Sequence, residues 1–276
     1  MSEPDEPVID VWSNWWDSDF FRVAPDLSRL YRKFGMTERT CLDLSDLLAQ
    51  AKSGNVSRII LSATAFPGST STNDLVAAVV DEAPELLVGC ASVDPREGIK
   101  AVRALRQSVR VLNFRALKLL PYLYEKPPNH AIYFPLYAAC VEEDVPVLIL
   151  TGHTAVQQAS EPGRPHYLDE VALHFPELTI IAGYAGFPWT QELISLAWKH
   201  DNVYIDTSGH RPKHFPSELV RYMDSYGRHK VLFGTGYPLM AYDDALKDLS
   251  EMALKPETRR AFLHENARNI WGWHDH

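Results

Sequence analysis

The chain has 276 residues, a length that fits one α/β barrel of about 250 residues. Its composition, with 46 % hydrophobic and 23 % charged residues, is ordinary for a soluble globular domain. The net charge of −9 argues against nucleic-acid binding, because contact with a phosphate backbone needs a basic patch. The N-terminus lacks the apolar segment of a signal peptide, and no apolar run reaches the length of a membrane span. We therefore expect a soluble, cytoplasmic protein that binds neither nucleic acid nor membranes.

Eight short apolar runs alternate with amphipathic stretches along the chain. The apolar runs occupy residues 8–11, 58–62, 87–92, 117–120, 147–150, 179–182, 203–206 and 230–234. Runs of this length are typical of parallel strands that are covered on both faces. The amphipathic stretches that predict helices include residues 73–81, 98–108, 166–175, 190–200 and 217–226. This alternation predicts a closed parallel barrel or a doubly wound sheet, and the number of strands does not decide between them.

Four of the predicted strand ends carry short motifs. Residues 9–14 read I-D-V-W-S-N, 146–152 read P-V-L-I-L-T-G, 184–189 read Y-A-G-F-P-W and 233–238 read F-G-T-G-Y-P. These segments resemble the amidohydrolase-related family, which includes the decarboxylases of aminocarboxymuconate semialdehyde and of γ-resorcylate. The family motifs are I-D-x-H-x-H, P-V-x-x-H-x-G, H-x-G-x-x-W and F-G-S/T-D-x-P. With a similar closing segment at 262–271, the resemblance covers nearly the whole chain and implies a single-domain (β/α)₈ TIM barrel over residues 1–276.

The resemblance breaks down at the positions of the family's metal ligands. At those five positions the chain has Trp12, Asn14, Leu150, Tyr184 and Gly236. On a strand, residues two apart point to the same face, so Trp12 and Asn14 keep the geometry of a histidine pair without its chemistry. An indole has no lone pair for a cation, and an amide oxygen is a weak neutral ligand. Since transition metals favour imidazole, thiolate or carboxylate, we expect no metal at this site and no other cofactor.

Five side chains near predicted strand ends are candidates for acid–base catalysis. His153 and His210 lie just beyond the fifth and seventh strands, and histidine has a pKa suited to proton transfer at neutral pH. Asp10 and Asp206 belong to the strand ends, where each could be a base or could be held by structural hydrogen bonds. These four residues could also form a different metal site, although their spacing matches no metal motif. The Tyr184 hydroxyl could donate a proton or could simply fill the vacated space.

Three basic residues are candidates for substrate binding. Lys118 lies inside the predicted fourth strand, where it could act as a base or as a Schiff-base former, or could pair with an Asp or Glu. Arg164 and Arg211 lie in the loops after the fifth and seventh strands. A guanidinium group there could clamp a substrate carboxylate, or it could be an ordinary surface charge.

Aromatic side chains gather at or just past the predicted strand ends. They are Trp12, Trp15, Trp16, Phe66, Tyr122, Tyr124, Tyr184, Phe187, Trp189 and Tyr237. Together with Asn14, Leu150 and Gly236, we expect them to form a hydrophobic pocket that suits a flat aromatic or polyketide-like ligand. Two long connections, 14–45 and 152–165, follow the first and fifth strands. Because such loops build the active sites of α/β barrels, we expect both to act as lids.

These features favour a metal-independent amidohydrolase-like enzyme, a hydrolase or a lyase, that acts on a small hydrophobic molecule. Lactone or ester hydrolysis, decarboxylation, hydration–dehydration and cyclisation all need an acid–base pair and a shaped site rather than a Lewis acid. The alternative is a non-catalytic barrel that serves as a binding protein or as a regulatory subunit of an active paralogue. Either a homodimer or an association with such a paralogue is compatible with the sequence.

Overall fold

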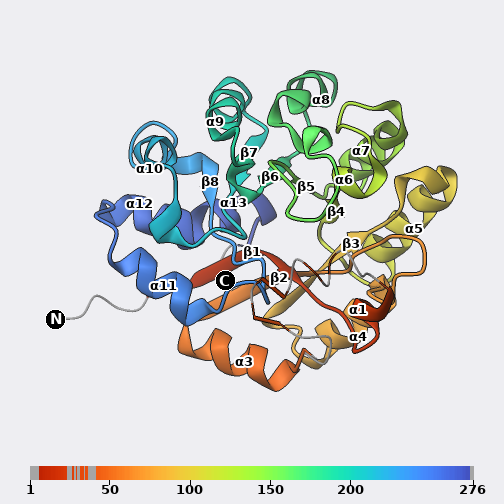
Figure 1. The fold of residues 1–276 in the computed structure, drawn as a ribbon, viewed down its shortest axis with the longest axis horizontal. Helices are drawn as coiled ribbons and strands as arrows, with labels where there is room; N and C mark the ends of the chain where they lie inside the picture. Colours follow the sequence, from red (N-terminus) through yellow and green to blue (C-terminus); the bar gives the residue numbers. More distant parts are fainter. Residues whose placement is uncertain are drawn as a thin grey trace.

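Eight parallel strands form one closed barrel (Figure 1). The computed structural model describes residues 6–23, 27, 29, 32–33, 35–36 and 42–273. The strands pair in chain order and are β1 (Val8–Asn14), β2 (Val56–Ser62), β3 (Leu87–Ser92), β4 (Leu117–Leu119), β5 (Val147–Leu150), β6 (Ile180–Gly183), β7 (Val203–Asp206) and β8 (Val231–Leu232). The barrel closes because the Val11 N–H donates to the Phe233 carbonyl at 3.1 Å and the Gly236 N–H donates to the Trp12 carbonyl at 2.8 Å. The predicted single-domain (β/α)₈ TIM barrel is confirmed.

Helices surround the barrel on its outer face (Figure 1). The longer ones are α3 (Leu44–Ser53), α4 (Asn73–Glu82), α5 (Ile99–Arg110), α7 (Phe134–Glu142), α8 (Leu168–His174), α9 (Thr190–Lys199), α10 (Ser217–Met223) and α11 (Tyr242–Ser250). Capping side chains set where two of them begin, since Asp43 accepts from the Ser45 N–H and Thr72 accepts from the Leu75 N–H. Shorter helices are α1 (Phe20–Val23), α6 (Pro121–Tyr124), α12 (Pro256–Arg260) and α13 (Asn266–Trp271). Among the described residues, none of the helices has the length and apolar character needed to cross a bilayer.

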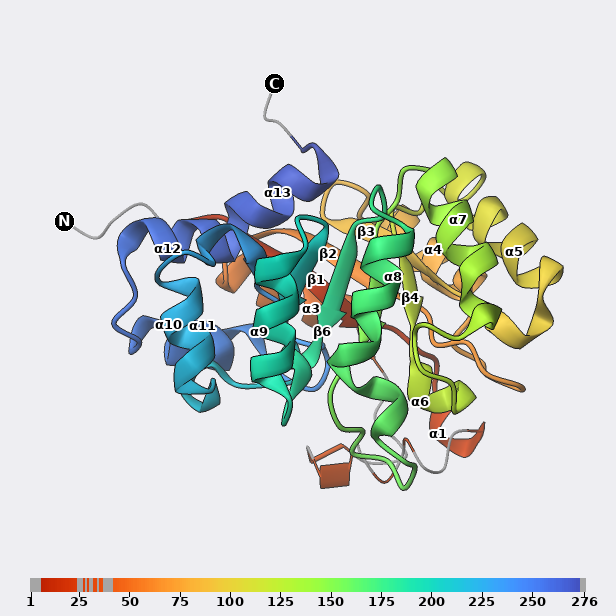
Figure 2. The ribbon, with the colours of Figure 1, turned by 90° about the horizontal axis from the view of Figure 1, so that it is seen from above.

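Short turns of 3-10 helix complete the connections between strands and helices. They are Pro95–Glu97, Ala131–Tyr133, Glu161–Gly163, Pro165–Tyr167, Tyr184–Gly186, Pro212–His214 and Arg228–Lys230, and one π-helical turn spans Ala261–Glu265. Helix α1 and the connection after β5 lie at the same end of the barrel, opposite to α13 (Figure 2). This is the end to which the carboxyl ends of the strands point. The described parts of the two segments predicted as lids therefore lie on the face where α/β barrels build their sites.

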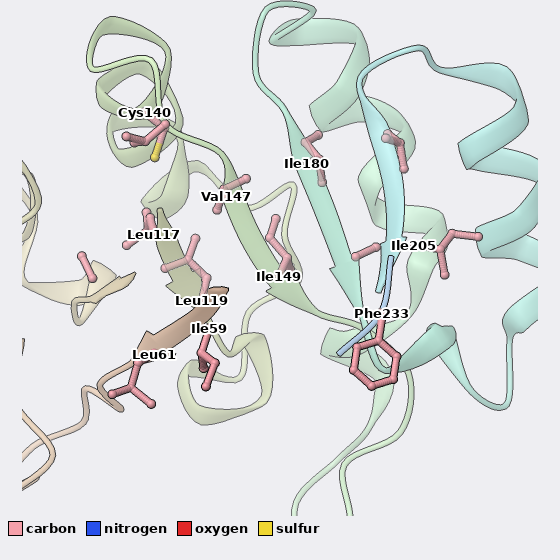
Figure 3. Packing of buried hydrophobic residues seen from close by; sticks show 14 of the residues in the cluster. Ile59, Leu61, Leu117, Leu119, Cys140, Val147, Ile149, Ile180, Ile205 and Phe233 are labelled. Carbon is pink, nitrogen blue, oxygen red and sulfur yellow. The ribbon is translucent and has the colours of Figure 1, made fainter. Parts of the chain in front are cut away.

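The strands bury both of their faces, which explains their continuous apolar sequences. Alternate residues point outwards to the helices, as Leu117, Leu119 and Ile149 do in Figure 3. The residues between them point into the barrel, where Cys90 and Leu148 belong to a second buried cluster. Side chains of the described residues thus fill the barrel interior.

Candidate active site

A cavity of about 180 Å³ lies at the carboxyl ends of the strands. Four of the five positions that hold metal ligands in related sequences line it: Trp12, Asn14, Leu150 and Tyr184. The fifth, Gly236, lies against them, because its carbonyl is 3.5 Å from Asn14 Nδ2 and a Cβ added to it would lie 3.4 Å from the Tyr184 hydroxyl oxygen. The structure thus brings all five positions together. A larger depression of about 550 Å³ lies at the opposite, amino-terminal end of the strands and contains none of them.

Two aromatic rings fill much of the space at the five positions. The Trp12 indole meets the Tyr184 ring edge to face, with ring centroids 5.6 Å apart. Glycines make room for both rings, since an added Cβ would lie 2.6 Å from the Trp12 ring at Gly183 and 2.3 Å from the Tyr184 ring at Gly209. Tyr184 itself has a φ of 61°, a left-handed conformation that is strained for a residue with a side chain. The chain therefore holds this ring in place at a conformational cost.

Lys118 is the most unusual charged residue of the site. It is fully buried on β4, and its Nζ donates hydrogen bonds to Asn14 Oδ1 at 2.8 Å and to Thr64 Oγ1 at 3.3 Å. Both acceptors line the cavity. No Asp or Glu among the described residues pairs with Lys118, so the expected acidic partner is absent and that alternative was wrong. Because neutral partners do not offset the loss of water, burial lowers the pKa of Lys118 to about 7.

The two predicted loop histidines both line the cavity. His153 and His210 both contact the Phe187 ring, each with its ring centroid 5.5 Å from that of Phe187. Burial lowers the pKa of His210, and the neighbouring His153 lowers it further. Neutral His210 is therefore the dominant form at neutral pH, which leaves it able to accept a proton.

Asp10 lies outside the cavity and ties the barrel together. Its carboxylate accepts hydrogen bonds from the Trp12 N–H, the Ser13 hydroxyl, the Tyr242 hydroxyl and both the N–H and hydroxyl of Thr235, at 2.5–3.1 Å. These bonds link β1 to the segment after β8. With both oxygens accepting from structural donors, the geometry favours the structural alternative for Asp10 over the catalytic one.

Asp206 is buried in the barrel and also lies outside the cavity lining. Its Oδ1 accepts from the Ser208 N–H at 3.1 Å and from the Ser208 hydroxyl at 2.7 Å. Its Oδ2 makes no hydrogen bond to the described residues. Burial raises the pKa of Asp206 to about 7, against the effect of the two Ser208 bonds. The structure therefore does not bring Asp206 together with His153 and His210 as one set of cavity residues.

Arg164 and Arg211 do not reach the cavity. Arg164 pairs with Glu192 at 2.8 Å and lies over the Trp189 ring, while Arg211 pairs with Asp248 at 2.6 Å. Each guanidinium group thus already has a carboxylate partner of its own, which favours the structural alternative over the substrate clamp for both arginines.

Of the predicted aromatic lining, Trp12, Tyr122 and Tyr184 contact the cavity. The others do not line it: Trp15, Trp16, Phe66, Tyr124, Phe187, Trp189 and Tyr237. The sequence interpretation missed several lining residues, which are Phe20, Leu27, Thr64, Leu120, Thr154, Ala155, Gly209 and Leu239. Thr64 lies two residues after the end of β2, and this place near a strand end could have marked it in the sequence. Residues 14–45 are only partly described, but Phe20 and Leu27 show that this segment contributes to the cavity wall, as do Thr154 and Ala155 of the connection after β5.

The sequence profile described as Amidohydrolase matches residues 9–273. The chain belongs to the amidohydrolase family. No curated protein matches the chain. Membership of the family supports a hydrolase- or lyase-type enzyme.

Several solved structures share the fold of this amidohydrolase. An uncharacterised TIM-barrel protein from Bordetella bronchiseptica has a TM-score of 0.81 at 21 % identity, over 96 % of this chain and 98 % of that one. A 2,6-dihydroxybenzoate decarboxylase from Rhizobium has a TM-score of 0.74 at 15 % identity, over 98 % and 99 %. The 5-carboxyvanillate decarboxylase from Novosphingobium aromaticivorans, complexed with manganese and 4-hydroxy-3-methoxy-5-nitrobenzoic acid, has a TM-score of 0.77 at 17 % identity, over 99 % and 97 %. These likenesses establish the shared fold.

The residues at the amidohydrolase metal site do not fit a metal ion. Of the two former ligand positions on β1, Trp12 offers no oxygen in its side chain, and Asn14 Oδ1 already accepts a hydrogen bond from Lys118 at 2.8 Å. A cation placed there would find no carboxylate at the other positions to neutralise its charge. Within the described part of the chain, no three His, Cys, Asp or Glu side chains gather in a group that could hold a metal.

Proposed function

We propose that this amidohydrolase is a metal-independent hydrolase or lyase that acts on a small, flat, largely apolar substrate. The observation that supports metal independence is the position of Lys118. Its amine lies 2.8 Å from Asn14, at the strand ends where the family positions its metal, and an amine that titrates near neutral pH can exchange a proton with a substrate there. The chemistry is then proton transfer and charge stabilisation by side chains.

The size and lining of the cavity support the substrate class. Its volume is about 180 Å³, and an apolar protein cavity of about 150 Å³ is large enough for benzene. A single-ring compound therefore fits, whereas a multi-ring polyketide does not fit without movement of the wall. Trp12, Leu120, Leu150 and Tyr184 supply flat or aliphatic surface, and the polar groups His153 and His210 lie at one side.

Lys118, His210 and His153 can divide the donation and acceptance of protons among them. Lys118 has a pKa of about 7 and His210 has a lowered pKa, so near neutral pH one group can hold a proton while the other accepts one. His153 lies beside His210 and is the second candidate base. The Tyr184 hydroxyl, which lies near Gly236 at the cavity wall, is suited to orient a substrate oxygen. Lactone or ester hydrolysis, decarboxylation, hydration–dehydration and cyclisation all use such a set.

The second candidate function is a non-catalytic barrel that binds a small molecule or serves as a subunit of an active paralogue or of a homodimer. The rings of Trp12 and Tyr184 occupy much of the former metal site, and this observation favours binding without catalysis. The remaining cavity, with a titratable lysine behind its wall, favours the enzyme.

An assay on metal-free protein tests the proposed function. Protein treated with dipicolinate is assayed at pH 7 on a panel of single-ring lactones, esters and carboxylic acids, with and without added Mn²⁺. We expect turnover that neither the chelator nor the metal changes, and a loss of at least about 100-fold in His210→Ala. A matched control is His229→Ala, which lies away from the cavity and should leave turnover unchanged. Turnover that requires added metal contradicts metal independence, and the absence of both turnover and ligand-induced thermal shifts contradicts the enzyme proposal.

A further inference from the structure

We propose that Lys118 is a nucleophile that forms an imine with an aldehyde or ketone bound in the cavity. The inference rests on the proposed function insofar as it uses the same cavity, but it assigns a covalent step and a carbonyl substrate class to that site. Three observations support the inference: the hydrogen bonds of Lys118 Nζ, the burial of Lys118, and the residues that separate Nζ from the cavity.

The number of hydrogen bonds matches an uncharged amine. A neutral lysine amine has two N–H donors and one lone pair, whereas an ammonium group has three donors. Nζ of Lys118 donates to two acceptors, Asn14 Oδ1 and Thr64 Oγ1, and has no third partner among the described residues. As an ammonium group it would bury one N–H without a partner and one charge without a counter-ion, and both are costly. As an amine it satisfies both donors and keeps its lone pair available.

A second lysine of the chain shows the contrasting arrangement. Nζ of Lys230 donates to the carbonyl oxygens of His200, Asp201 and Val203, at 2.7–3.3 Å. Three acceptors use all three donors of an ammonium group, and the residue lies at the amino-terminal end of β8, away from the cavity. Lys230 is therefore a structural cation. Lys118 has the bonding pattern of a nucleophile.

The wall between Lys118 and the cavity is one side chain thick. Both acceptors of Nζ, Asn14 and Thr64, line the cavity. The bond to Thr64 is the longer and therefore the weaker of the two at 3.3 Å, so a substrate carbonyl can displace the Thr64 hydroxyl from Nζ. Asn14 stays in place because its Nδ2 also donates to the Tyr237 carbonyl at 3.1 Å. A carbonyl group can then approach Nζ while Asn14 still orients the amine.

The covalent step balances without an added cofactor. The lone pair of Nζ attacks the carbonyl carbon, so a C–N bond forms while the C=O π bond breaks. The oxygen takes up one proton from the nitrogen and one from the solvent by way of His153 or His210. Loss of one water molecule gives the protonated imine. In a β-keto acid, the positive nitrogen of the imine accepts the electron pair of the neighbouring C–C bond as carbon dioxide leaves. In other carbonyl compounds it accepts the electron pair of a neighbouring C–H bond as the proton leaves. His153 or His210 returns a proton to the resulting enamine carbon, and one water molecule then hydrolyses the imine and restores the amine.

Reductive trapping tests the imine. Benzaldehyde, a single-ring aldehyde, is incubated with the protein at about pH 7 in the presence of sodium cyanoborohydride, and the adduct is located by peptide mass spectrometry. Ordinary lysines are protonated at this pH and react slowly. We expect one benzyl group on the peptide that contains Lys118 and at least 10-fold less on that of Lys230. The intact mass of Lys118→Met should show no adduct. In Leu150→Trp, where the new side chain fills the cavity, the amount of adduct on Lys118 should fall at least 10-fold.

Binding and trapping are measured separately, so that the two proposals can fail separately. Benzaldehyde that binds in the cavity should raise the melting temperature of wild type but not of Leu150→Trp. If it does so and yet labels Lys118 no faster than Lys230, the imine is overturned and the cavity proposal is intact. Benzaldehyde that produces neither a shift nor a specific adduct overturns both. If Lys118→Met fails to fold, the wild-type and Leu150→Trp peptide maps still decide the result.

Discussion

Replacing Lys118 by methionine is expected to stabilise the protein at neutral pH, by an amount that depends on pH. Burial lowers the pKa of Lys118 from its ordinary 10.5 to about 7. At about 1.4 kcal/mol per pH unit, carrying the charge costs the folded state about 5 kcal/mol below pH 7. Between pH 7 and pH 10.5 the unfolded chain binds the proton and the folded state does not, so the cost fades as the pH rises and is gone above that window.

The hydrogen bonds of Lys118 reduce this gain. Methionine leaves the oxygens of Asn14 and Thr64 without their donor, at roughly 1 kcal/mol each. The variant should therefore be more stable than wild type by about 3 kcal/mol below pH 7, and less stable by about 2 kcal/mol above the window. Urea denaturation followed by tryptophan fluorescence at several pH values between 6 and 9.5 measures the difference.

An exposed lysine provides the control for this experiment. Lys247→Met, on the solvent side of α11, should change the free energy of unfolding by less than about 0.5 kcal/mol at every pH. A difference between Lys118→Met and wild type that stays constant over the pH range would refute the reasoning, because it would mean that Lys118 keeps an ordinary pKa in the folded protein.

Three further substitutions test individual contacts. Wild-type stability should fall as the pH rises from 3.8 to about 7, because burial raises the pKa of Asp206 and only the unfolded chain loses the proton in that window. Asp206→Asn should remove this fall. An unchanged pH dependence of the melting temperature in the variant contradicts the prediction. Gly209→Ala places a Cβ 2.3 Å from the Tyr184 ring, and Gly68→Ala is its control, since φ is also positive there but nothing lies within 4 Å. Gly209→Ala should lower the free energy of unfolding by about 1–3 kcal/mol more than Gly68→Ala does. Equal melting temperatures of the two variants refute the predicted clash. Arg211→Ala removes the ion-pair partner of the Asp248 side chain, which is only 5 % exposed, and should cost about 1–3 kcal/mol with turnover unchanged. A large loss of turnover would return Arg211 to the site.

The barrel and the position of the site could be predicted because both depend on local patterns. Continuous apolar runs locate buried parallel strands, and β3, β5 and β7 begin and end where the sequence placed them. Strand ends in a parallel barrel meet on one face, so motifs far apart in the sequence were expected to converge there. The convergence of Trp12, Asn14, Leu150 and Tyr184 around one cavity follows from the same rule.

The roles of the charged residues could not be predicted because they depend on partners that are distant in the sequence. The neutral acceptors of Lys118 come from β1 and from the segment after β2, and no local pattern marks them. The hydrogen bonds of Asp10 to Thr235 and Tyr242 likewise cross more than 200 residues. A strand-end aspartate has the same sequence signature whether it anchors the barrel or acts as a base.

Metal binding by the purified protein tests the central claim most directly. Protein expressed in medium with added manganese and zinc is dialysed, and its metal content is measured by plasma mass spectrometry. The variant that ends at Trp273 is measured alongside it, so that His274 and His276 cannot contribute. With Asn14 bound to Lys118 at 2.8 Å and no imidazole or carboxylate at the other four positions, we expect far less than one metal ion per chain in both proteins. One tightly bound metal ion per chain in the shortened variant would contradict the account.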